Sequence, residues 1–201
     1  MDVSHEQTSA RDRGRQETRR RLVASAHALF ASHPLARVTT HDIARGAGVA
    51  AGTFYLHFSD KEAVFREIVY SAIERLRARL QQAMKDAPDG EAGIRAHAEA
   101  LVSFAEDNAD LMRIVFGRDH GSAELESDVL DYMAAVGADM LRRRIQDGHF
   151  RGSLDPRVAA QALTGMFSRT VIWWIEDPSR CPRETLIETL AGIQLGGTYS
   201  D

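Results

Sequence analysis

The sequence has 201 residues, of which 44% are hydrophobic and 27% are charged, and its formal net charge is −4. This length and composition fit one ordinary domain or two small ones with a buried core, and they exclude a low-complexity chain. No apolar run approaches the roughly 20 residues of a membrane-spanning helix. The polar first 21 residues do not resemble a signal peptide, and the single cysteine, Cys181, excludes an internal disulfide. We therefore expect a soluble, cytoplasmic protein.

The charges are unevenly distributed along the chain. Residues 1–61 contain nine Lys and Arg against six Asp and Glu, a balance of +3, whereas residues 62–201 contain sixteen against twenty-three, a balance of −7. Much of the positive excess lies in Arg11, Arg13, Arg15, Arg19, Arg20 and Arg21. Such a segment indicates contact with a polyanion at one end of the protein, or equally a solvated tail that has no partner.

The N-terminal segment divides into an arm and a first helix. Residues 1–14 lack apolar periodicity and are predicted to form a disordered basic arm. From about residue 15, apolar side chains recur at helical spacing, and the helix is predicted to end near His33 and Pro34.

Two short helical segments follow, at residues 40–46 and 50–57, with Gly48 between them. Thr39 and Thr40 both suit the N-cap of the first segment. Ser59 and Glu62 have the spacing of a capping box, which predicts that Ser59 opens a long helix to about residue 85.

The rest of the chain is predicted to be entirely helical. After a loop at residues 85–90, helical periods occupy the segments 91–107, 109–117, 122–149, 155–177 and 183–196. We therefore predict an all-α fold of about nine helices, divided into the arm at 1–14, a segment of mostly short helices at 15–61, and a larger segment of longer helices at 62–201.

The two short helices have the side chains that a helix-turn-helix requires. Ala44 is small enough for two helices to cross closely, Gly48 tolerates positive φ at the turn, and Phe54 supplies an apolar plug on the second helix. Residues 38–61, VTTHDIARGAGVAAGTFYLHFSDK, resemble the DNA-binding signature of the TetR family of transcriptional regulators. The resemblance implies a homodimer in which each subunit has a three-helix, helix-turn-helix DNA-binding domain at 15–61 and a larger helical effector-binding and dimerisation domain at 62–201.

The predicted DNA-binding domain contains two groups of candidate DNA contacts. The first residues of a recognition helix face the major groove, where a threonine can bond a base or a phosphate and an alanine can pack on a thymine methyl. The resemblance implies base contacts at His41, Ala51, Gly52 and Thr53. It implies contacts with the DNA backbone at Thr40, Tyr55, His57 and Lys61.

The second half of the chain is predicted to sense an effector and to dimerise. The segment 155–177 is apolar almost all round, so it is expected to be buried from two sides, and with 183–196 it suits the dimer interface that the resemblance implies. Apolar and aromatic side chains of the middle helices suit a pocket for a lipophilic or aromatic effector. The candidates are Phe104, Met112, Phe116, Tyr132, Met140, Phe167 and Trp174.

No sequence motif indicates catalysis, a cofactor or a metal site. The eight histidines include no pair four residues apart, and no P-loop or Gly-x-Ser-x-Gly elbow is present. We predict a sequence-specific DNA-binding regulator, a repressor released from a palindromic operator by a small effector, and not an enzyme. The alternative is a helical ligand-binding or adaptor protein whose head no longer reads specific DNA, because Ala51 and Gly52 have short side chains.

Overall fold

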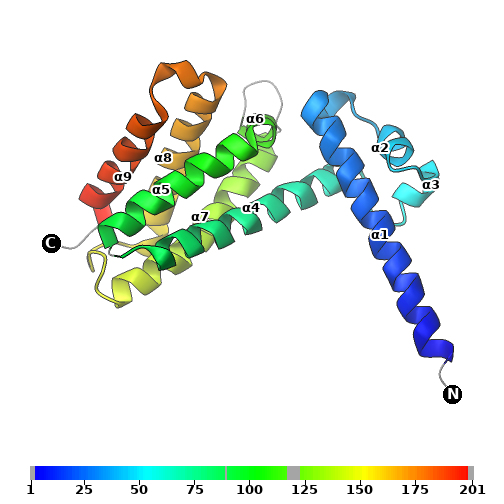
Figure 1. Cartoon of the computed structure of the whole chain (residues 1–201), viewed down its shortest axis with the longest axis horizontal. Helices are drawn as coiled ribbons and strands as arrows, with labels where there is room; N and C mark the ends of the chain where they lie inside the picture. The colour runs from blue at the N-terminus through cyan, green and yellow to red at the C-terminus, as the bar shows by residue number, and fades with distance from the viewer. Residues whose placement is uncertain (1–2, 89, 117–122, 199–201) are drawn as a thin grey trace. The chain divides into compact units, whose positions relative to one another are not determined.

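The computed structural model describes residues 3–88, 90–116 and 123–198. Within these residues the chain forms nine α-helices and two short 3-10 helices (Figure 1), which confirms the predicted all-α fold. The helices are α1 (Val3–Ser32), η1 (Leu35–Arg37), α2 (Thr40–Gly46), α3 (Ala51–Phe54), α4 (Lys61–Asp86), α5 (Gly90–Asp107), α6 (Ala109–Phe116), α7 (Ala123–Gln146), α8 (Pro156–Glu176), η2 (Pro178–Arg180) and α9 (Arg183–Thr198). The predicted helix ends at 117 and 122 lie outside the described residues.

Helix α1 begins earlier than expected. The prediction of a disordered arm over residues 1–14 is wrong for the part that is described, because α1 already starts at Val3. The segment contains no proline, and once the buried part of the helix has formed, each further residue adds one hydrogen bond without a new nucleation step. The periodicity argument failed because a solvated helical turn needs no apolar face.

Two further elements differ from the prediction. Helix α3 ends at Phe54 and not near residue 57, because the following amides of Leu56 and His57 bond the carbonyls of Thr53 and Phe54 in three-residue turns. The cap of α4 is Asp60 and not Ser59, since the Asp60 carboxylate accepts the Ala63 amide at 2.6 Å.

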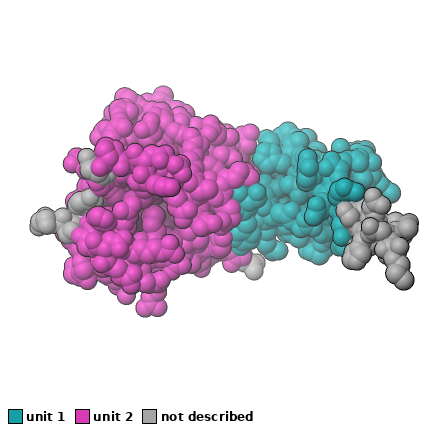
Figure 2. All heavy atoms as spheres, turned by 60° about the horizontal axis from the view of Figure 1, so that its bottom comes forward, with its two compact units in different colours: residues 1–71 teal, residues 72–201 magenta. Residues whose placement is uncertain are grey.

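The chain divides into two compact units, residues 1–71 and 72–201 (Figure 2), and we call the first of these the head. Helix α4 contributes its first turns to the head and the rest to the second unit. We expected the boundary after residue 61, but the two units divide ten residues later, after residue 71. The reason is that Val64, Phe65 and Ile68 are buried with the head. Phe65 also packs edge-on against Phe30 of α1, with ring centroids 5.3 Å apart.

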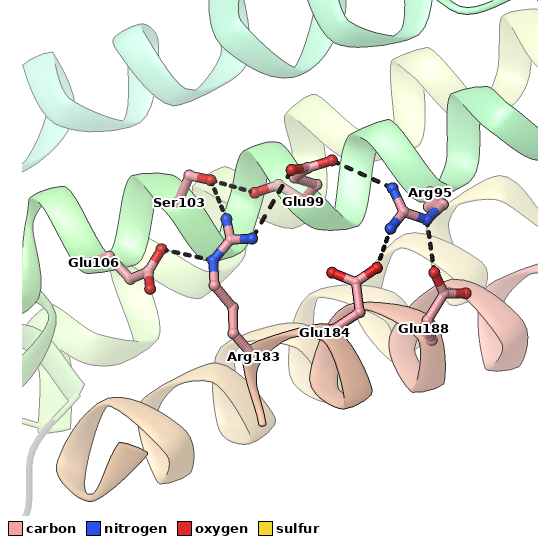
Figure 3. Close-up of polar contacts among 7 residues, drawn as sticks. All are labelled: Arg95, Glu99, Ser103, Glu106, Arg183, Glu184 and Glu188. Carbon is pink, nitrogen blue, oxygen red and sulfur yellow. Dashed lines mark hydrogen bonds and ion pairs between the residues drawn. The ribbon is translucent and has the colours of Figure 1, made fainter. Parts of the chain in front are cut away.

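In the second unit, α7 packs along α8 and α5 packs along α9. Two arginines tie α5 to α9 (Figure 3): Arg95 on α5 bonds Glu184 and Glu188 on α9, the latter at 2.6 Å. In the opposite direction, Arg183 on α9 donates to two residues of α5, Glu106 at 3.1 Å and Ser103 at 2.6 Å. The carboxylates around Arg95 raise the pKa of its guanidinium. Among the described residues, no helix has the length and apolarity needed to span a bilayer.

Candidate DNA-binding head and effector site

Helix α2 is capped by its own sequence. Thr39 accepts the Asp42 amide at 3.1 Å, and the Asp42 carboxylate accepts the Thr39 amide at 3.3 Å, which completes a capping box. The hydrogen bond from the Thr39 hydroxyl to the Asp42 carboxylate is the main cause that lowers the pKa of Asp42. The predicted helix bounds at 40–46 and the capping role of Thr39 are therefore confirmed.

The turn between α2 and α3 depends on glycine and on a distant arginine. Gly48 has a φ of 65°, a conformation that favours glycine. Arg21 of α1 donates to the Ala47 carbonyl and, at 3.2 Å, to the Gly48 carbonyl, so α1 holds the turn in place. Gly46, which sequence reasoning did not single out, lies so close to Ser25 of α1 that a Cβ would meet its hydroxyl at 2.3 Å.

Helix α3 presents small side chains to solvent and anchors itself through Phe54. Phe54 is fully buried and its ring lies 5.8 Å from that of Phe58, as expected for the plug of the head. Ala51 and Gly52 are exposed, and Thr53 is half-buried. A Cβ added at Gly52 would meet nothing within 4 Å, so this face of α3 is open.

Two of the predicted backbone-contact residues lie together. Tyr55 is 61% exposed, and its hydroxyl lies 3.1 Å from the Thr40 hydroxyl at the first position of α2. His41, beside Thr40, is also exposed. The head therefore presents two adjacent hydroxyl groups and an exposed imidazole beside the capped start of α2.

Lys61 and Arg19 have partners inside the head. The Lys61 ammonium donates to the carbonyls of Leu35, Ala36 and Val38 at 2.9, 3.4 and 3.2 Å, which joins the start of α4 to η1. Arg19 bonds Glu67 of α4, and its guanidinium lies 4.3 Å from the centroid of the Phe58 ring. Sequence reasoning counted Arg19 only as part of the basic segment. The available signal was its position three residues before the buried Leu22, on the inner face of α1.

His57 is held by the same arginine. Its carbonyl accepts a hydrogen bond from Arg19 at 2.9 Å. Burial is the main cause that lowers the pKa of the His57 imidazole, and the positive charges of Arg15 and Arg19 lower it further.

The predicted effector residues lie on α5, α6, α7 and α8, four helices that pack on one another in the second unit. Phe104, Phe167 and Trp174 are buried, whereas Met112, Phe116, Tyr132 and Met140 are half-buried. The Tyr132 hydroxyl donates to Glu74 of α4 at 2.6 Å. This hydrogen bond is the main cause that lowers the pKa of the Glu74 carboxyl. The indole of Trp174 donates to the Cys181 carbonyl at 3.0 Å. The pocket itself stays a prediction.

Sequence reasoning missed one buried polar side chain of this region. His97 on α5 is 7% exposed, and its ring lies 5.6 Å from that of Phe167. Its Nδ1 atom has no hydrogen-bond partner among the described residues. The signal was a lone histidine on an apolar face of the predicted helix 91–107, three residues after Ile94 and four before Leu101.

This arrangement of α1, α2 and α3 defines a helix-turn-helix DNA-binding protein. Residues 22–68 match the family described as bacterial regulatory proteins, tetR family. These residues therefore form the DNA-binding domain of the TetR family, and the prediction of a TetR-family regulator and not an enzyme is confirmed.

Proteins of similar sequence and structure cover almost the whole chain. The transcriptional repressor KstR2 of Rhodococcus jostii is 26% identical over 200 residues, covering 93% of this chain and 94% of KstR2. The structure of FadR from Bacillus subtilis in complex with stearoyl-CoA has a TM-score of 0.71 at 20% identity, covering 88% of this chain and 97% of FadR. The SmeT–triclosan complex has a TM-score of 0.70 at 21% identity and covers 92% of both chains; SmeT is the repressor of a Stenotrophomonas maltophilia multidrug efflux pump.

Proposed function

We propose that this protein is a cytoplasmic repressor that binds a palindromic operator as a homodimer and leaves it when a small, largely apolar effector binds. The observation that carries the proposal is the pair of hydroxyls of exposed Tyr55 and half-buried Thr40 beside an open α3. Hydroxyl side chains can donate a hydrogen bond to a phosphate, and the small residues of α3 let its backbone approach the bases closely.

DNA recognition is divided between two groups of residues in this proposal. Thr40, Tyr55 and His57 contact phosphates, and Lys61 acts near the DNA through its charge while its protons bond the carbonyls at 35, 36 and 38. His41 and Thr53 supply polar groups for base edges, and Ala51 and Gly52 supply close contact.

Dimerisation uses α8 and α9. Their inner faces are buried in the second unit, and Val158 and Trp173 on α8 and Ile193 on α9 remain exposed. These exposed apolar side chains lie on the two helices that the family resemblance assigns to the dimer interface. A dimer is also what an operator of two half-sites requires, because two recognition helices must enter major grooves about 34–36 Å apart.

The effector is proposed to bind among Phe104, Met112, Phe116, Tyr132, Met140, Phe167 and Trp174. Apolar and aromatic side chains with few polar groups favour a ligand with a large apolar body. The ligands in two structures of similar fold, stearoyl-CoA and triclosan, support this class of effector.

We propose that effector binding changes DNA binding through a movement of α4. This helix has 26 residues and is about 39 Å long at 1.5 Å per residue. Two bonds tie α4 to effector-site helices: Tyr132 of α7 to Glu74, and Arg79 to Asp107 at the end of α5, the latter at 2.9 Å. A ligand that displaces α5 or α7 therefore pulls on α4, and α4 contributes its first turns to the head. Linkage requires this ligand to bind the released state more tightly than the DNA-bound state.

The test compares two equivalent tyrosine substitutions. Genomic fragments are first selected with the purified protein to obtain the operator. Tyr55→Phe should then weaken binding of the dimer to the operator by about a hundredfold, because about tenfold is expected for one lost hydrogen bond to a charged group in each of the two half-sites. Tyr132→Phe, the matched control in the second unit, should leave operator affinity unchanged and reduce release by effector. Equal damage to both functions in both variants would refute the proposed division.

The second candidate, an adaptor whose head has lost sequence specificity, is favoured by the small residues Ala51 and Gly52 on α3. It predicts that selection recovers no common fragment. It also predicts that DNA binding falls steeply with salt and is the same for all sequences.

A further inference from the structure

His97 is a buried polar side chain for which the described part of the chain supplies no partner at Nδ1. The ring lies in the interior of the second unit and is 7% exposed. Buried polar atoms in folded proteins are nearly always hydrogen-bonded, and an unpaired one calls for an explanation. A bound ligand is one such explanation.

The surroundings of His97 identify the kind of ligand. Leu101 and Phe104 lie one and two turns further along the same face of α5, and both are buried. The face of α8 that carries Phe167 lies opposite, with the Phe167 ring inclined by 63° to the imidazole. Phe104 and Phe167 both belong to the proposed effector site, so His97 adds a polar atom to an aromatic and aliphatic wall.

The imidazole is uncharged at neutral pH. Burial lowers its pKa from 6.5 to about 4, and no charged neighbour contributes to this change. A neutral imidazole has one nitrogen that donates and one that accepts. It does not compensate the charge of a carboxylate or phosphate, whose desolvation in this wall would be highly unfavourable.

We propose that His97 is the polar recognition residue of the effector site and that Nδ1 hydrogen-bonds an uncharged hydroxyl group on an otherwise apolar effector. The inference rests on the proposed function, because it assigns a residue and a ligand class to the same site. A hydroxyl both donates and accepts, so it matches Nδ1 in either tautomer of the ring. The rest of the ligand lies against the apolar side chains of α5 and α8.

The test uses two probes that differ only by a hydroxyl group, para-hexylphenol and hexylbenzene. The proteins are the wild type, His97→Phe, His97→Gln and Gln194→Leu. His97→Phe keeps a ring against Phe167, and His97→Gln keeps a donor and an acceptor. Gln194→Leu is the matched control, since it removes Oε1 of Gln194, the other buried side-chain atom without a partner among the described residues.

The wild type should bind the phenol about tenfold more tightly than the hydrocarbon, as expected for one neutral hydrogen bond. His97→Phe should remove this preference, His97→Gln should retain part of it, and Gln194→Leu should retain it fully. The nitrogen NMR signal of the His97 ring should shift with the phenol and not with hexylbenzene. Absence of binding to both probes, an unchanged preference in His97→Phe, or an unmoved ring signal would each overturn the proposal.

Operator binding by the same proteins separates this inference from the proposed function. All four should bind the operator equally in the absence of probe. If they do and His97→Phe keeps the phenol preference, only the role of His97 is wrong. If the wild type binds no specific operator, the proposed function fails, whatever the probes show.

Discussion

Acidification should destabilise the second unit through His97. The pKa of the buried imidazole is about 4, against 6.5 for the exposed ring. Between these values the unfolded state binds a proton that the folded state excludes. The stabilisation by neutral His97 is therefore fully present above about pH 6.5 and is lost as the pH falls towards about 4.

The size of this effect follows from the two pKa values. One pKa unit corresponds to about 1.4 kcal/mol, so the whole difference amounts to about 3 kcal/mol of the free energy of unfolding. About 2 kcal/mol of it should be lost between about pH 7.5 and about pH 5. This window lies above the one in which Asp155, Asp177 and Glu74 contribute, because the pKa values of these carboxyl groups are lowered from ordinary values of 3.8, 3.8 and 4.5.

The assay is urea unfolding of the wild type and His97→Phe at these two pH values. Trp173 and Trp174 are the two tryptophans of the chain and both lie in the second unit, so their fluorescence follows that unit. The wild type should lose about 2 kcal/mol more than the variant on acidification. The lowered pKa of His57 in the head is common to both proteins and cancels in the difference. The same pH dependence in both proteins, or a folded His97 ring that titrates near 6.5 by NMR, would refute the reasoning.

Three further predictions concern contacts inside the head and contacts inside the second unit. Gly48→Ala should destabilise the head by about 1 kcal/mol in thermal melts followed by circular dichroism, because alanine is strained at positive φ; Gly14→Ala, within α1, should not destabilise it, and equal effects would contradict the role of the turn. Arg19→Ala should destabilise the head by about 1 kcal/mol through loss of its contacts with Glu67 and Phe58, whereas Arg20→Ala should have little effect because its side chain is exposed. Arg95→Ala combined with Arg183→Ala should lower the melting temperature more at low salt than at high salt, since screening weakens exposed ion pairs; a salt-independent change would show that packing, and not charge, joins α5 to α9.

The local signals of the sequence predicted α2 and its turn correctly. Thr39 and Asp42 cap the helix from within four residues, and Gly48 supplies the positive φ that ends it. A cap or a turn is formed by residues that are close in the chain, so the local sequence contains every group that takes part in it. The same reasoning assigned the cap of α4 to Ser59, because a serine and an aspartate in adjacent positions suit the N-cap equally well and only the geometry selects Asp60.

The sequence by itself determined the helical fold, the helix-turn-helix and its family, because apolar period, capping residues and the run at 38–61 are local properties. Only the tertiary structure decided which polar side chains are left for a partner. Arg19 bonds Glu67, 48 residues away, and Lys61 bonds the Leu35 carbonyl, 26 residues away, so two cations that appear free in the sequence have partners in the fold. His97 is the reverse case. On the surface, water would hydrogen-bond its ring, but in the fold it is buried without a partner at Nδ1 among the described residues. The physical reason is that hydrogen bonding and desolvation depend on distances between segments, which the order of residues along the chain does not contain.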